Sequence, residues 1–75
     1  MVDDKETYWN YRVVKKGELY GIHEVHYNSD GKPELISENP AMVEAESRDG
    51  VKWCIRMMES NWCLPVIDFH TLEEI

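Results

Sequence analysis

The residues of this chain best suited to chemistry are its histidines. His23 and His26 flank Glu24, and His70 lies near the C-terminus. The zinc-protease motif needs two histidines four residues apart on one helical face, whereas His23 and His26 are three apart. On a strand, Glu24 and His26 point to the same face and His23 to the other. Glu24, His26 and His70 are therefore the candidate metal ligands, and a polar pair on a solvated sheet face is the alternative interpretation.

The two cysteines, Cys54 and Cys63, are nine residues apart. With Cys54 on a helix and Cys63 just past its end, their Cα atoms would be roughly 13 Å apart, and a disulfide tolerates less than about 7 Å. We therefore predict two reduced thiols in a cytoplasmic protein. A core position for Cys54 and the negative end of the helix dipole at Cys63 both disfavour a nucleophile. No catalytic residue and no cofactor is predicted.

Length and charge narrow the classes of function. The chain has 75 residues, with 15 acidic and 8 basic side chains and a net charge of -7. This length predicts one domain, residues 1–75, with a frayed segment at residues 1–7. The acidic balance argues against direct nucleic-acid binding, which needs Lys and Arg to displace counterions. The short apolar runs predict no membrane span, and the N-terminus shows no secretory signal.

Alternating aromatic and β-branched residues predict strands over residues 8–15 and 19–27, joined as a hairpin. The Asp-Gly dipeptide at 30–31 is a strong turn signal, and a third strand follows at about residues 34–37. Gly21 breaks the alternation and is expected to mark a bulge.

A helix is expected after Ser47, a good N-cap residue. Pro65 ends it, and residues 66–69 can form a short closing strand. These elements predict an α+β fold: a small antiparallel meander of three or four strands in the order β-β-β-α, with one amphipathic helix packed on one face. The apolar residues of the helix recur at i, i+3, i+4, i+7 and i+11, and they are Val51, Cys54, Ile55, Met58 and Trp62.

Two features indicate an interaction surface. Trp53 and Met57 lie four residues apart and off the apolar stripe, and Tyr20 is expected to be half-buried; Trp and Tyr commonly anchor interfaces. Residues 29–47 hold five acids and one base. That charge either keeps a small protein soluble or meets a basic partner. The acidic candidates for contact are Glu38, Glu44 and Glu46.

The runs WNYRV at 9–13 and YGIHEV at 20–25 resemble a group of short bacterial open reading frames. In that group an Asp-Gly turn and an acidic helix ending before a proline follow, and the Asp-Gly turn at 30–31 and Pro65 fit this order. The resemblance covers about residues 8–67 and implies no activity. The helix departs from the group's plainer Leu/Glu pattern through its Trp, Cys and Met residues. More remotely, the β-β-β-α order is similar to small HicB-like antitoxins, in topology alone.

Together these features predict a non-enzymatic protein-interaction module of bacterial or phage type. It is expected to form a homodimer, because a chain of this length buries little core of its own. A sharper hypothesis is an inhibitor or antitoxin-like partner that blocks a basic protein. The alternative is a small metal-binding protein using Glu24, His26 and His70.

Overall fold

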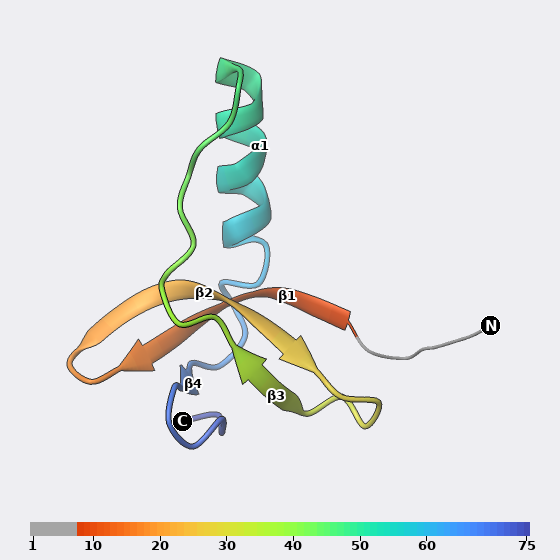
Figure 1. Ribbon diagram of the computed structural model, residues 1–75, viewed down its shortest axis with the longest axis vertical. Coiled ribbons are helices and arrows are strands. Elements are labelled where there is room, and N and C mark those ends of the chain that lie inside the picture. Colours follow the sequence, from red (N-terminus) through yellow and green to blue (C-terminus); the bar gives the residue numbers. More distant parts are fainter. Residues whose placement is uncertain (1–7) are drawn as a thin grey trace.

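The computed structural model describes residues 8–75, and the predicted fraying of residues 1–7 lies outside this range. It contains one four-stranded sheet, in the order β3-β2-β1-β4, and one helix (Figure 1). The α+β class and the element order are therefore confirmed. The elements are β1 (Tyr8–Lys16), β2 (Leu19–Tyr27), β3 (Pro33–Ile36), α1 (Arg48–Glu59) and β4 (Ile67–Asp68).

β1 and β2 form the long hairpin that organises the molecule. They pair antiparallel without a break from Tyr8↔Tyr27 to Lys16↔Leu19. The tight turn between them needs a positive φ, which Gly17 supplies at 66°. The prediction of a bulge at Gly21 is wrong, because this residue pairs in register with Val14. The irregularity in strand register lies instead in the pairing of β2 with β3, between residues 26 and 27.

The sheet is mixed, where the sequence predicted an antiparallel one. β2 pairs antiparallel with β3, but β4 pairs parallel with β1, through Val14↔Ile67 and Lys15↔Asp68. A parallel neighbour needs a long crossover connection, and here the chain passes through β2, β3 and α1 before it returns. The C-terminal segment thus closes the edge that β1 would otherwise expose.

The core lies on one face of the sheet, called here the inner face. Val14, Val25, Tyr27 and Ile67 are buried there, and Phe69 packs against them. Alternation along β1 and β2 places Arg12 and His23 on the same face, and both are buried as well. The inner face is therefore a small apolar cluster with two buried polar side chains beside it.

Arg12 ties this core to the C-terminal segment. Its guanidinium donates to the Tyr27 hydroxyl at 2.8 Å, to the Pro65 carbonyl at 2.6 Å and to Glu74 Oε2 at 3.0 Å. The Tyr27 hydroxyl in turn donates to Asn10 Oδ1 at 2.8 Å. A buried guanidinium must be paired to be tolerated, and this network supplies the partners.

Helix α1 begins as predicted and packs differently. The Ser47 side chain caps it by accepting a hydrogen bond from the Gly50 N–H at 3.0 Å. The helix ends at Glu59, short of the predicted end near Pro65, and only its residue Met58 is buried. It contacts β1 and stands away from the sheet (Figure 1). Within residues 8–75, no helix has the length and apolar character needed to cross a membrane.

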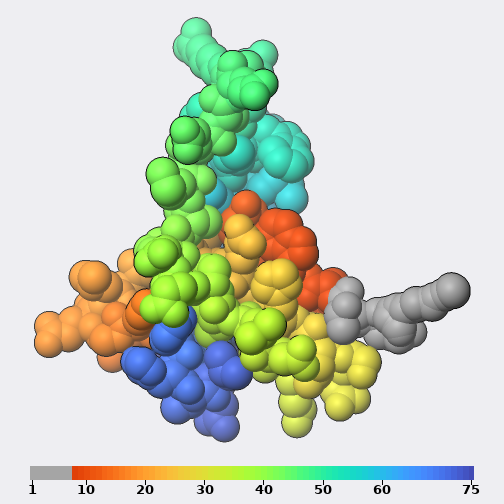
Figure 2. Space-filling view, in the orientation of Figure 1, coloured from red at the N-terminus to blue at the C-terminus, as the bar shows by residue number. Residues whose placement is uncertain are grey.

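Residues 37–46, called here the strap, connect β3 to α1 and lie along the helix (Figure 2). The strap is tied to β2 by hydrogen bonds from Ser37 N to Glu24 O at 2.9 Å and from Ala41 N to Ile22 O at 2.7 Å. The Cys54 thiol lies 3.9 Å from the Glu44 carbonyl oxygen. The strap thus covers one side of the helix and leaves the others to solvent.

Candidate interaction site

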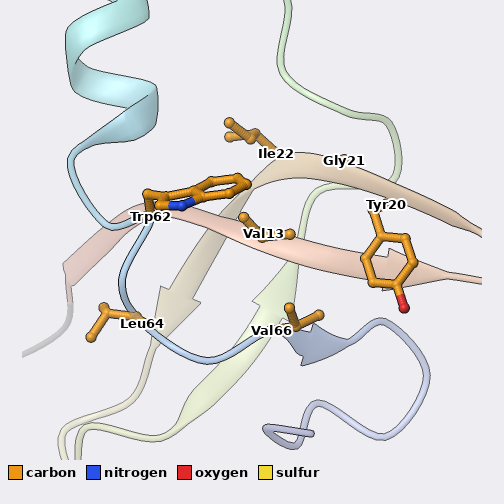
Figure 3. Close-up of a pocket in the computed structure, with 7 residues that line it drawn as sticks. All are labelled: Val13, Tyr20, Gly21, Ile22, Trp62, Leu64 and Val66. Carbon is orange, nitrogen blue, oxygen red and sulfur yellow. The ribbon is translucent and has the colours of Figure 1, made fainter.

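An apolar groove lies between the outer face of the sheet and the segment that leaves α1. It encloses about 530 Å³. Figure 3 shows Ile22 and Val13 on neighbouring strands, with the Trp62 ring beside them and Leu64 and Val66 on the returning chain. The groove is lined by Val13, Tyr20, Gly21, Ile22, Trp62, Leu64 and Val66.

The outer face carries these side chains because the hairpin alternates. Val13 pairs with Ile22, and Tyr11 pairs with Glu24 on the same face. Asn61, just past α1, donates to the Tyr11 carbonyl at 3.1 Å and so fixes the end of the helix over β1. Burial raises the pKa of the Tyr11 hydroxyl, and the charges of Glu24 and Cys54 add to this effect.

Much of the apolar surface at this corner is exposed. Trp62 is 71% exposed and Ile55 49%, although both belong to the stripe that the sequence predicted to be buried. The helical spacing grouped these apolar residues on one side of the helix, but the helix does not lie flat on the sheet, so most of that side is not buried. Among residues 8–75, thirteen large apolar side chains are exposed and five are buried, so the chain leaves more apolar side chains in water than it hides.

Trp53 and Met57 form a second exposed apolar surface on α1. At 100° per residue they lie on the side of the helix away from Ile55, and Trp53 is 63% exposed. Gly50 and Cys54, which contact the strap, lie between the two exposed sides. The predicted exposure of Trp53 and Met57 is thus observed, whereas Tyr20, which was expected to be half-buried, is 63% exposed.

The acidic candidates are spread along the strap. Glu38, Glu44 and Glu46 are all exposed. Glu38 is held by Lys16, whose Nζ donates to its backbone carbonyl at 2.7 Å and to its Oε2 at 3.1 Å. The strap runs beside α1, where the Glu44 carbonyl meets the Cys54 thiol, whereas Trp53 shares a shallow surface hollow with Asp49, Lys52 and Arg56.

The structure does not gather the candidate metal ligands. Glu24 and His26 share the outer face of β2, as predicted from their spacing. His70 follows β4, where its ring meets the edge of Phe69 at 5.3 Å between centroids. No three His, Cys, Asp or Glu side chains within residues 8–75 lie close enough together to hold a metal ion.

Both cysteines are free thiols. Cys54 is half-buried against the strap, and Cys63 is exposed in the turn after α1.

The sequence did not point to the groove, because its walls come from segments 40 residues apart. Ile22 and Leu64 each appear as ordinary apolar residues in the chain. Arg12 and His23 were also missed as buried groups. The sequence did contain a signal for them: Arg12 is two residues from Val14, and His23 is two residues from Val25, so each lies on the same face of its strand as a core residue.

Comparison with known proteins finds no matching family model, no matching curated protein and no matching solved structure.

Proposed function

We propose that this chain is a non-enzymatic protein-interaction module whose first partner is a second copy of itself. The supporting observation is the exposed apolar corner formed by α1 and the groove. A helix of 12 residues is marginal in water by itself, and α1 buries only Met58 within the chain. Packing against another chain supplies the burial that this helix lacks.

The exposed apolar surface at this corner is large enough to form the centre of a dimer interface. Trp62 and Tyr20 are 71% and 63% exposed, and together they present about 250 Å². Ile55, Leu64 and the adjoining helix side enlarge this surface toward the ~800 Å² that each partner buries in a stable complex. At about 25 cal/mol per Å², the two rings alone contribute several kcal/mol of apolar burial.

Charge complementarity favours a second copy. Lys52 and Glu59 lie seven residues apart on one edge of the helix, beside Ile55. In an antiparallel pair of α1 helices with a two-fold axis near Ile55, each Lys52 faces the Glu59 of the other copy. This arrangement also brings the first turn of one helix over the groove of the other, as a self-complementary interface requires.

Sedimentation equilibrium of a variant series tests this proposal. Ile55→Glu places a charge at the two-fold axis and should dissociate the dimer. Lys52→Glu should weaken it, and Lys52→Glu combined with Glu59→Lys should restore it, because the swapped charges again face each other. Leu35→Ala removes an apolar side chain that is 63% exposed on β3 and does not line the groove, so it should leave the mass unchanged. A monomeric wild type, or no recovery in the charge-swapped pair, would overturn this interface.

A second candidate function uses the other side of α1. Trp53 and Met57 are exposed on α1, and the strap that contacts this helix at Cys54 carries the exposed acids Glu44 and Glu46. An apolar patch next to negative charge suits a basic protein partner, as in the hypothesis of an inhibitor or antitoxin-like protein. This surface lies away from Ile55, so a dimer leaves it free.

Capture from a cell lysate on immobilised chain, washed at increasing salt, tests this second function. The immobilised wild-type chain should hold a basic partner at low salt and release it at high salt. The Trp53→Ala chain should fail to hold the same partner even at low salt. Retention of the same protein by Trp53→Ala and by a Glu44→Gln/Glu46→Gln variant would exclude this surface.

A further inference from the structure

We propose that a second cavity, between the β1–β2 hairpin and the strap, binds a small uncharged molecule that carries a hydroxyl or N–H group on an apolar body. The cavity encloses about 390 Å³, which lies within the size range of ligand sites. Lys16, Leu19, Tyr20, Gly21, His23, Glu38, Asn39 and Pro40 line it. The proposal rests on His23 on the inner face of the hairpin, which does not line the groove, although Tyr20 and Gly21 border both the groove and this cavity.

His23 provides the polar anchor. Its side chain is 2% exposed, and its Nδ1 lies 2.9 Å from the Ser37 carbonyl oxygen. A carbonyl only accepts, so Nδ1 carries the proton of this hydrogen bond. In the neutral ring, Nε2 is then a bare acceptor.

Nε2 has no hydrogen-bond partner among residues 8–75. Within those residues, Arg12 Nε is the side-chain nitrogen or oxygen that is both closed off from solvent and without a hydrogen-bond partner. His23 Nε2 is not closed off in this way. Nε2 is therefore unpaired and yet reachable. A buried acceptor in this condition favours a ligand that donates a hydrogen bond to it.

Gly21 leaves the approach to Nε2 open. A Cβ at this position would lie 3.5 Å from Nε2 and 3.4 Å from Pro40 Cβ. The absent side chain thus leaves room between the histidine and the strap. Gly21 pairs in register within β2 and does not have a positive φ, so its backbone does not require glycine.

The remaining walls define the ligand class. Leu19, Tyr20 and Pro40 offer apolar surface to the body of a small molecule. Lys16 uses two of its three donors on Glu38, and its Nζ sits 4.4 Å from the centre of the Phe69 ring. Its charge is already paired with Glu38, so the cavity suits an uncharged ligand with one donor for His23 and an acceptor for Lys16.

Phenol and toluene are matched probes, since they have the same size and differ in the donor. Long-range ¹H–¹⁵N spectra of the histidines at pH 8 follow each ring nitrogen during titration. We expect phenol to shift His23 Nε2 saturably, at millimolar concentration, and to leave the exposed His26 unchanged. Toluene should bind at least about fivefold more weakly, because it cannot pair Nε2.

Gly21→Ala supplies the blocked variant. Its methyl group makes ordinary van der Waals contacts, so the fold should persist while the phenol response is lost. The comparison of phenol with toluene on the wild-type chain tests the proposal without any variant. Absence of a saturable His23 shift, equal binding of toluene, or an unchanged response in a folded Gly21→Ala variant would each overturn it.

Discussion

The guanidinium of Arg12 donates a 2.8 Å hydrogen bond to the hydroxyl of Tyr27 inside the small core. The two residues lie on neighbouring strands, and the same hydroxyl donates to Asn10. This pair therefore joins the apolar cluster to the network that holds the C-terminal segment. A buried cation in so small a core makes the structure sensitive to single-atom changes at this position.

Tyr27→Phe removes one oxygen and leaves both the Arg12 donor and the Asn10 acceptor short of a partner. We expect a loss of about 1–3 kcal/mol in the free energy of unfolding, measured by urea denaturation. Tyr8→Phe is the matched control, because the Tyr8 ring stacks on Tyr27 at 4.7 Å and is half-exposed. An equal loss in both variants would show that the Tyr27 hydroxyl contributes no more to stability than an exposed hydroxyl, and it would contradict the role of this network.

Two glycine substitutions should act in opposite directions. Gly21→Ala fits the backbone and should stabilise the fold by about 0.4–1 kcal/mol, because it restricts the unfolded chain. Gly17→Ala meets no atom within 4 Å but places a Cβ at a φ of 66°, so it should destabilise by about 1 kcal/mol. Thermal unfolding of the two variants measures both effects. A lower melting temperature for Gly21→Ala would mean that β2 tolerates no side chain there.

Asp68 should make stability depend on acid pH. The N–H groups of Thr71 and His70 donate to its carboxylate, at 3.0 Å and 2.9 Å, and they lower its pKa. A carboxylate with a lowered pKa stabilises the fold above its unfolded pKa of about 3.9, and this contribution is lost as the pH falls through the folded value.

Asp68→Asn keeps an acceptor oxygen and removes the charge. The variant should be less stable than wild type at pH 7, and the difference should shrink as the pH falls below about 4. Urea unfolding at several pH values measures this, with Asp30→Asn in an exposed turn as the control. A constant difference from pH 7 to pH 2 would contradict the role of the charge.

The local features of this fold could be predicted from sequence. Alternation identified β1 and β2 and their faces, and Ser47 identified the helix start, because each depends on neighbouring residues. The sequence could not show how Ile55 packs, since periodicity identifies an apolar side without saying what covers it. The parallel pairing of Val14 with Ile67 likewise depends on contacts between distant segments.

The candidate site was predicted only in part. The spacing of Trp53 and Met57 was enough to place them off the stripe, and both are exposed. The groove and the cavity at His23 arise where the strap and the returning chain meet the hairpin. Their walls come from remote parts of the sequence, so no local pattern indicated them.

The mass of the chain in solution tests the central proposal most directly. Sedimentation equilibrium of the wild type over a range of concentrations should give twice the chain mass of 8.9 kDa, with Ile55→Glu at 8.9 kDa and still folded by circular dichroism. A wild-type chain that stays at 8.9 kDa at the highest concentration, with α1 helical, would contradict the account.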